Sequence, residues 1–178
     1  MLRSSKKLRT HEQGFSLVEM LLATVILLVG LVAVAQLVPA SVLMNYSNRM
    51  DSSALVFAQR ELDQMLDQPL TSTAFLDSLG NACQLGNPAT PNVVQGNAVT
   101  VSVDNRAIIN FGPAPVAGYS FLYTDPTDPN GATYDVRWAV IITGNGATES
   151  SRRFILGVRQ VGGRTFVSPV TLDTMVTR

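Results

Sequence analysis

The chain has 178 residues, of which 46% are hydrophobic, and a formal net charge of zero. This length predicts one domain with an appendage, and the zero charge argues against a general nucleic-acid-binding protein. The chain contains a single cysteine, Cys83, and a single histidine, His11. One cysteine cannot form an internal disulfide, and the histidine lies near the N-terminus. Histidine-based catalysis and most zinc sites are therefore excluded for the bulk of the chain.

Residues 1–14 form a short polar segment with four basic residues and one acid. Residues 15–38 are apolar except for one charge, and they are long enough to cross a bilayer core that needs about 20 residues. Because basic residues precede the apolar run, we expect a cytoplasmic N-terminus and a single-pass protein whose remainder lies outside the cytoplasm. That remainder is mildly acidic.

Residues 40–68 keep a helical period but become amphipathic. Pro69 ends the pattern, because a residue that precedes proline is disfavoured in the helical region. We expect one helix over residues 15–68, with its transmembrane half at 15–38 and a kink at Pro39. Its amphipathic half carries a stripe of apolar residues every three to five positions: Leu43, Tyr46, Met50, Ala54, Phe57 and Leu62.

Residues 69–97 are rich in Asn, Gly, Pro, Ser and Thr and are predicted to be a connecting loop. Residues 98–178 then show period-two alternation, which predicts half-buried antiparallel strands. A hairpin loop is expected at 143–150 and a closing strand near 165–167. The predicted fold is α+β, with the long N-terminal helix packed on a C-terminal antiparallel β-sheet head. The four strand segments with alternating apolar residues are 98–103, 118–124, 133–142 and 152–161.

Glu19 is the one charge inside the predicted span. A carboxylate in hydrocarbon costs about 2.5–3.5 kcal/mol on insertion scales, and no lysine or arginine occurs between residues 15 and 48 to pair with it. A cut after Gly14 would create a free amine at Phe15, one helical turn from Glu19. In an assembly, the amine of one copy could instead meet Glu19 of a neighbouring copy.

The segment GFSLVEMLLATVILLVGL, residues 14–31, resembles the N-terminus of type IV prepilins and type II secretion pseudopilins. That family combines a short basic leader ending in glycine, a phenylalanine or methionine, a small or hydroxyl residue, two aliphatic residues, a glutamate and an apolar helix. The resemblance covers residues 1–68, and no motif relates the β-rich head to a family. The matching positions are Gly14, Phe15, Ser16, Leu17, Val18 and Glu19.

The resemblance implies that a membrane prepilin peptidase removes the leader after Gly14 and methylates the new amine of Phe15. It also implies that Glu19 pairs with the amine of an adjacent subunit, and that the apolar stripe from Leu43 to Leu62 packs against neighbouring helices. The expected partners are the prepilin peptidase, other pilin subunits and the inner membrane before assembly. Nucleic acid is not an expected partner. No catalytic residue, cofactor or metal is implied, because the chain is the substrate of its processing enzyme.

The stretch VILLVGLVAVAQL, residues 25–37, is similar to PilV-like minor pilins. The chain lacks the cysteine pair of many major pilins, and its proline falls later than in many pilins. The PilV-like stretch and the missing cysteine pair favour a minor pilin that supports pilus assembly, whereas the late proline implies a displaced kink. A type II secretion pseudopilin, and a membrane-anchored β-rich binding protein that never polymerises, are the alternatives.

Two other kinds of N-terminal segment share some of these features. AVAQ at residues 33–36 would fit the cut site of a secretory signal peptide, and an uncleaved anchor would also carry a basic leader. Neither explains why Glu19 falls five residues after Gly14.

The sequence DPTDPNG at 125–131 fails the EF-hand spacing and is typical of a turn. Cys83 is expected to be a free thiol or to be solvent-exposed. The chain has no Gly-x-Ser-x-Gly, Walker or Gly-x-Gly-x-x-Gly motif, so an enzyme is not expected. Five arginines could form a nucleic-acid surface, but nearby acids and strand alternation favour a solvated sheet face: Arg137, Arg152, Arg153, Arg159 and Arg164.

Overall fold

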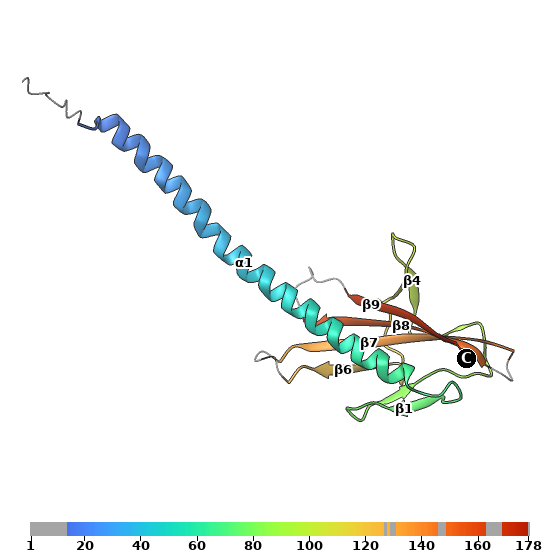
Figure 1. Ribbon diagram of the computed structural model, residues 1–178. Helices are drawn as coiled ribbons and strands as arrows, with labels where there is room; N and C mark the ends of the chain where they lie inside the picture. The colour runs from blue at the N-terminus through green and yellow to red at the C-terminus, as the bar shows by residue number, and fades with distance from the viewer. Residues whose placement is uncertain (1–13, 127, 129–130, 146–148, 163–168, 178) are drawn as a thin grey trace, which may run out of the picture. The chain divides into compact units, whose positions relative to one another are not determined.

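The computed structural model describes residues 14–126, 128, 131–145, 149–162 and 169–177 (Figure 1). The chain divides into two compact units, Met1–Asn45 and Tyr46–Arg178. The first unit is helical and the second combines the end of the helix with all the strands. The predicted α+β fold, with a long N-terminal helix and an antiparallel sheet, is confirmed.

The helix α1 (Leu17–Leu66) starts and ends two residues inside the predicted range of 15–68. Pro39 lies within α1, and the helix continues past it although proline supplies no backbone donor. Two residues later, the Ser41 hydroxyl donates to the carbonyl of Leu37 at 2.9 Å. In the second unit, one face of α1 is buried at helical spacing, by Met50, Ala54, Phe57, Ala58, Glu61, Leu62 and Met65.

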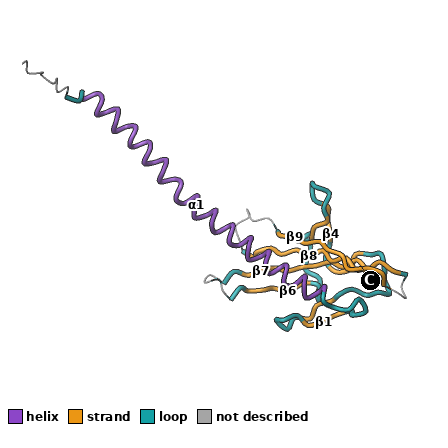
Figure 2. Tube along the Cα trace, in the orientation of Figure 1, coloured by secondary structure: helices purple, strands orange, loops and turns teal. Residues whose placement is uncertain are grey.

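The main sheet has five strands, all antiparallel, and is built around β7 (Thr133–Gly144). β8 (Glu149–Val161) pairs with one edge of β7, and β9 (Val170–Thr177) pairs with the far edge of β8. β3 (Val94–Gly96) and β6 (Ser120–Thr124) share the other edge of β7 at different positions along it. Figure 2 shows β6, β7, β8 and β9 running side by side.

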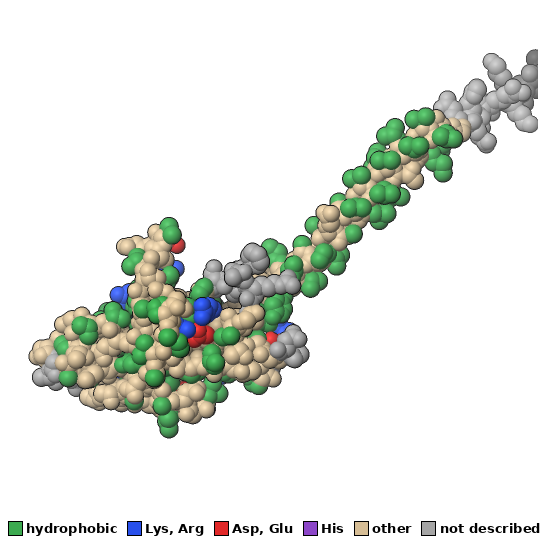
Figure 3. Space-filling view, turned by 180° about the vertical axis from the view of Figure 1, so that it is seen from behind, with side chains coloured by type: hydrophobic (Ala, Val, Ile, Leu, Met, Phe, Trp, Pro, Cys, Tyr) green, Lys and Arg blue, Asp and Glu red, His purple; other side chains and the backbone are tan. Residues whose placement is uncertain are grey.

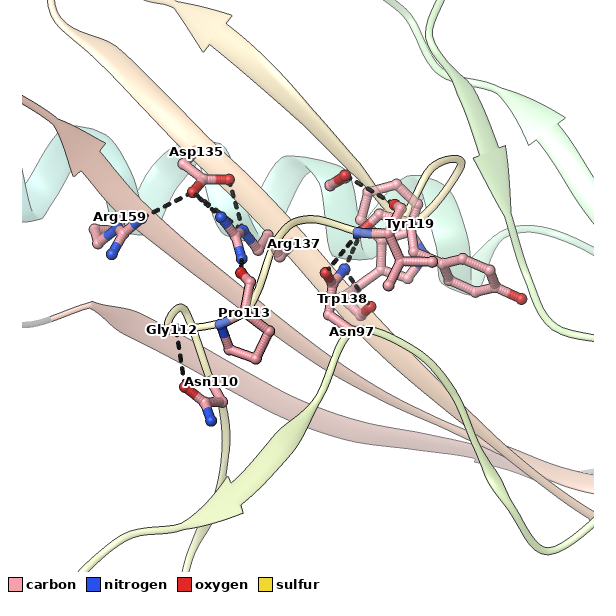
Figure 4. Close-up of polar contacts among 11 residues, drawn as sticks. Asn97, Asn110, Gly112, Pro113, Tyr119, Asp135, Arg137, Trp138 and Arg159 are labelled. Atoms are coloured by element: carbon pink, nitrogen blue, oxygen red, sulfur yellow. Dashed lines mark hydrogen bonds and ion pairs between the residues drawn. The ribbon is translucent and has the colours of Figure 1, made fainter.

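Asn97 joins the two short strands that share this edge of β7. Its side-chain Nδ2 donates to the carbonyls of Tyr119 and Trp138 at 2.7 and 3.1 Å, and its Oδ1 accepts from the amide of Val116 at 3.0 Å. Asn97 is buried, so these bonds satisfy polar side-chain atoms that lie away from water. Figure 4 shows Asn97 between Tyr119 and Trp138.

The segment 69–97, predicted to be a connecting loop, contains three short strands. These are β3, β1 (Ala74–Leu76) and β2 (Ala82–Gln84), of which β1 and β2 form a hairpin of their own. The loop prediction is therefore wrong. Strands of three residues are too short to show an alternating pattern, and their pairing is decided by partners elsewhere in the chain.

The first predicted strand is shorter and more exposed than expected. β4 (Val99–Val101) pairs only with β5 (Ala107–Ile109), in a separate two-stranded sheet. Val99 packs against the core, but Val101 is 63% exposed and Val103 is fully exposed. The expectation that these three valines share a half-buried face is wrong, because the hairpin projects beyond the residues that could cover it.

The strand predictions over the centre of the sheet are confirmed. Alternate residues of β7 and β8 face α1 and form the main core, together with Cys83 and Leu85. Each large apolar side chain buried in this way contributes about 1.5–3 kcal/mol relative to an exposed position. The β-strand members of this core are Tyr134, Val136, Trp138, Val140, Ile142, Phe154, Leu156 and Val158.

The other face of the sheet, here called the back face, is covered as well. Ile109 of β5 packs there on Ala139 and Ile155. Gly157 of β8 allows this approach, because a Cβ at that position would lie 2.8 Å from the Cβ of Ile109. The central strands are thus buried on both faces, whereas their alternating sequence predicted one solvated face.

The end of the sheet differs in detail from the prediction. Gly144 pairs with Glu149, so the connection between β7 and β8 is shorter than the predicted loop of 143–150. The predicted closing strand at 165–167 lies outside the described residues. The strand that closes the sheet in the described part of the chain is β9, over Val170–Thr177.

Candidate functional site

The N-terminal segment places the predicted processing residues just before α1. Gly14, Phe15 and Ser16 are exposed and precede the first helical residue, Leu17. The amide of Met20 donates to the carbonyl of Ser16 at 3.1 Å, which makes Ser16 the residue that caps the helix. A Cβ added at Gly14 would meet no described atom within 4 Å. Packing within the described chain therefore gives no reason for a glycine at this position.

Glu19 lies in the first turn of α1 and is exposed. The spacing from Ser16 to Glu19 matches a capping box, in which the two side chains bond reciprocally to backbone amides. No such bond forms in the described part of the chain, and Glu19 has no ion-pair partner there. Within the first turn, Glu19 is stabilised by the helix dipole, whose positive end lies at the N-terminus of the helix.

The first unit exposes its apolar side chains without cover. A stretch of α1 is long and apolar enough to cross a membrane, and none of it is buried inside the protein. Figure 3 shows hydrophobic side chains along this helix. Such a surface requires either lipid or other helices around it.

The apolar stripe of α1 divides into two parts. Leu43 and Tyr46 are exposed by 50% and 45%, and they remain available to other helices. The other four residues are at most 8% exposed and pack on the chain's own sheet: Met50, Ala54, Phe57 and Leu62. The expectation that all six contact neighbouring helices is corrected for these four, because a helix period marks an apolar face without saying which partner covers it.

Phe57 also forms an aromatic stack. Its ring lies parallel to that of Tyr123, with 3.9 Å between centroids, and Arg60 lies over both rings. Through this stack, α1 packs against β6 at the edge of the sheet.

Residues 9–35 match the family model of the prokaryotic N-terminal methylation motif. The chain carries the prepilin-type methylation motif. The motif supports a type IV pilin-like or pseudopilin-like protein, and its family is structural rather than enzymatic. No curated protein and no solved structure gives a significant match to the chain.

The match includes Gly14, Phe15 and Glu19 of the pilin-like chain, and the part at 9–13 lies outside the described residues. It ends before the head begins. The head therefore has to be interpreted from its own geometry.

Two arginines that were predicted to be solvated are buried in the head of the pilin-like chain. Arg152 is 1% exposed, and it binds both carboxylate oxygens of Glu149 at 2.7 and 2.8 Å. It also donates to the backbone carbonyls of Leu70 and Ser72. Arg152 thus ties β8 to the segment that follows α1, and the prediction of a solvated position is wrong for it.

Arg137 is the second buried arginine, at 5% exposure. It pairs with Asp135, which is two residues away on the same strand, at 2.8 Å. Of the remaining three, Arg153 pairs with Asp173 and Arg159 with Asp135, while Arg164 lies outside the described residues. Strand alternation could not reveal this burial, because the covering hairpin and loop come from elsewhere in the sequence.

The head contains a buried acid that the sequence interpretation missed. The Glu61 side chain is fully buried, and its Oε1 accepts from Arg60 at 3.1 Å and from Gln64 at 3.2 Å. Its Oε2 is buried and has no hydrogen-bond partner in the described structure. Burial raises the pKa of Glu61, and the nearby Asp77 carboxylate raises it further. The signal in the sequence was an acid on the apolar stripe, between Phe57 and Leu62.

For Cys83 the prediction of a free thiol is confirmed, whereas the alternative of solvent exposure is wrong. It is a free thiol, but it is fully buried in β2 rather than exposed. Burial raises the pKa of Cys83 to about 12, and Asp77 and Glu61 add to the effect. A thiol in this state behaves as a small apolar core residue.

Proposed function

We propose that the chain is a minor pilin-like subunit of a type IV pilus. In this proposal a prepilin peptidase cuts after Gly14 and methylates Phe15, and the subunit waits in the inner membrane with its head outside the cytoplasm. It then enters a filament through α1 and supports assembly. The methylation motif at residues 9–35 is the observation that carries the proposal.

The surroundings of Gly14 support the processing step. Open space around Gly14 means that the described chain does not itself require a glycine there. A glycine that the fold does not need is consistent with recognition by another protein. The exposed segment from Gly14 to Ser16 is also accessible to an enzyme.

The unpaired Glu19 supports the assembly step. An acid that lies in hydrocarbon without a partner is costly, and pairing it with a positive charge lowers that cost. The amine created at Phe15 would provide that partner, within one subunit or between two. The same argument holds for a type II secretion pseudopilin, which is the second candidate because the motif is common to both classes.

The test is the N-terminus of the mature protein, determined by mass spectrometry. We expect a chain that begins at Phe15 and carries one extra methyl group. The change Gly14→Val should block processing, whereas Gly30→Ala is a matched control, because Gly30 also has open space around it. A mature chain starting at Gln36 would establish a signal peptide instead, and an intact leader would establish an uncleaved anchor.

The subclass is tested by fractionation. Detection in sheared surface filaments at few copies per filament supports the minor pilin. Recovery only from the cell envelope, together with loss of protein secretion on deletion, supports the pseudopilin. A processed chain that never enters any filament would contradict both.

A further inference from the structure

β6 is an edge strand of the main sheet, and its outer side is open (Figure 1). In the part of the chain that the structure describes, β6 pairs only with β7. At one end of β6, the amide of Trp138 donates to the carbonyl of Tyr119 at 3.0 Å. At the other end, the amide of Asp125 donates to the carbonyl of Ala132 at 2.9 Å. The odd-numbered residues 119 and 125 therefore direct their backbone groups toward β7.

The even-numbered residues of β6 point the other way, because successive residues of a strand direct their backbone groups to opposite sides. Ser120, Leu122 and Thr124 thus each present one N–H and one C=O to the outer side. No other described strand pairs with them, and Leu122 and Thr124 are exposed. Such a row of backbone groups is a template to which an extended segment adds through main-chain hydrogen bonds.

β6 also lacks the features that usually protect an edge strand. Natural sheets place charged residues, prolines or β-bulges at their edges, which discourage the addition of a further strand. The sequence of β6, SFLYT, contains no charge and no proline, and its register with β7 runs without a bulge. Its central residue, Leu122, is 66% exposed. The strand at the opposite edge, β9, carries the charged Asp173 near its middle.

A groove lies beside this edge on the front face of the sheet, which is the face that α1 covers. It has a volume of about 330 Å³ and is lined by Val56 and Phe57 of α1 and by Tyr123 of β6. Val56 is 67% exposed, and Phe57 stacks on Tyr123. One basic and one acidic residue, Arg60 and Asp125, also line this front groove, so neither sign of charge is favoured. The front groove therefore suits an aliphatic side chain.

A second groove lies beside the same edge on the back face. It has a volume of about 310 Å³, and its lining includes Leu122, Arg137 and Arg159. Both arginines donate to the carboxylate of Asp135, as Figure 4 shows. These three charged side chains carry one surplus positive charge, and the Arg159 side chain is the exposed one, at 41%. The back groove therefore favours an acidic side chain.

The surplus charge acts on an added strand at long range. Asp135 lies on β7 directly opposite Leu122 of β6. Neighbouring strands lie about 4.8 Å apart, so a strand added to β6 would lie about 10 Å from β7. This is close to the Debye length of about 10 Å at 0.1 M salt. The attraction to an acidic side chain is therefore weakened by salt without being lost.

The two grooves match the geometry of a strand. Side chains of a strand point alternately to the two faces of its sheet. A segment added to β6 would therefore direct every second side chain toward the front groove and the others toward the back groove. Aliphatic and acidic residues that alternate over about five positions would suit both grooves.

We propose that β6 binds an extended segment of a different protein by strand addition. An aliphatic side chain of that segment occupies the front groove, and an acidic side chain lies over the back groove. The inference rests on the proposed function, because a subunit present at few copies has mostly other proteins as its neighbours. It adds to assembly through α1 a contact of the head that relies on backbone hydrogen bonds.

The test uses the full-length protein in bacteria that assemble the filament. A photoreactive phenylalanine analogue replaces Thr124, and mass spectrometry locates the cross-links formed on illumination. We expect a link to one short segment of another protein, in which acidic and aliphatic residues alternate. Adding Leu122→Pro should lower the yield at least about tenfold, because it removes an outward N–H donor. Proline is tolerated at such a position, since the bonds between β6 and β7 do not use this N–H.

Two controls separate the backbone from the side chain. Leu122→Ala keeps the N–H and should keep at least about half of the yield. Val101→Pro is the matched proline control, because Val101 is 63% exposed on the edge strand β4. Its N–H also points outward, since the adjacent Ser102 amide donates to the Arg106 carbonyl of the neighbouring chain segment. Val101→Pro should leave the yield unchanged.

A second proline variant guards against misfolding. Ser120→Pro removes another outward N–H of β6 and should lower the yield as Leu122→Pro does. Slow alkylation of the buried Cys83 reports that the head of each variant remains folded.

The acidic character of the partner is tested at Arg159. Arg159→Ala should lower the yield about threefold, the size expected for one charge acting over about 10 Å. Arg153→Ala is the matched control, because Arg153 lies on the same strand with 42% side-chain exposure and pairs with Asp173. It should leave the yield unchanged.

Four outcomes would overturn the inference. These are a processed protein that gives no cross-link, a yield that neither proline in β6 lowers, a link only to a second copy of this chain, and a yield that does not respond to Arg159→Ala. A protein that keeps its leader would instead overturn the proposed function, so the two failures are distinguishable.

Discussion

The indole Nε1 of Trp138 donates a hydrogen bond to the backbone carbonyl of Gln84 at 2.9 Å. Trp138 is fully buried at the centre of β7, and Gln84 ends the small β1–β2 hairpin. The bond joins parts of the chain that are 54 residues apart. It also gives the fully buried indole N–H of Trp138 an acceptor.

We expect Trp138→Phe to lower the free energy of unfolding by about 2–4 kcal/mol, because it removes this hydrogen bond and leaves the core underfilled. The measurement is denaturant unfolding of residues 46–178, the unit that contains the whole core. Leu122→Ala, at an exposed position of β6, should change the stability by less than about 0.5 kcal/mol. Equal effects of the two changes would contradict the role of the Trp138–Gln84 bond.

The raised pKa of Glu61 predicts that the stability of the folded head depends on pH. Its folded-state pKa is raised above the usual value of 4.5, chiefly by burial. The unfolded state therefore loses this proton at a lower pH than the folded state does. The contribution of Glu61 is fully favourable at low pH and is lost as the pH rises from 4.5 through the folded-state pKa.

We expect Glu61→Gln to become increasingly stabilising, relative to the wild type, as the pH rises through that window. The measurement is the difference in unfolding free energy between variant and wild type at several pH values. Asp63→Asn, at an exposed position of the same helix, is the control and should show little pH dependence. A difference for Glu61→Gln that stays constant from about pH 4 to 8 would rule out a raised pKa.

The burial of Cys83 predicts that its thiol is alkylated slowly in the folded head. With a pKa of about 12 and no exposure, Cys83 offers almost no thiolate to a reagent. We expect alkylation at pH 8 to be at least about 100-fold slower than for an exposed thiol, and to become normal in denaturant. Leu76→Cys, at a position 71% exposed on β1, supplies the exposed comparison. Similar rates at the two positions would place Cys83 at the surface after all.

The proposed charge pair of Glu19 predicts that a change at this residue affects filament assembly but not processing. We expect Glu19→Ala to leave cleavage after Gly14 intact and to lower the amount of protein in filaments by more than about tenfold. The reason is that removing one partner of a buried ion pair costs about 3–5 kcal/mol. Immunoblots of sheared filaments and of membranes measure both steps. Gln36→Ala, which changes a neutral polar residue of the same helix, is the control. Wild-type levels of Glu19→Ala in filaments would contradict the charge pair.

Local sequence was sufficient for the elements whose pattern repeats several times. Charge, an apolar run and a single acid defined the N-terminal segment, because the methylation motif is a run of neighbouring residues. The alternation in β6, β7 and β8 predicted which residues face the core, since each strand is long enough to display a period of two. Lone features such as the three-residue strands, buried Cys83 and buried Arg152 could not be predicted in this way.

The sequence by itself determined that the chain carries a prepilin-type N-terminus, an apolar helix and a sheet, because each depends on neighbours along the chain. Only the tertiary structure decided which residues cover each face of α1 and of the sheet. It buried Met50, Ala54, Phe57 and Leu62 under the chain's own sheet, and left Leu43 and Tyr46 exposed. It also brought Asp135 and Arg159 together across 24 residues. Burial depends on segments that are distant in sequence, and a local period does not encode which of these segments packs against a given face.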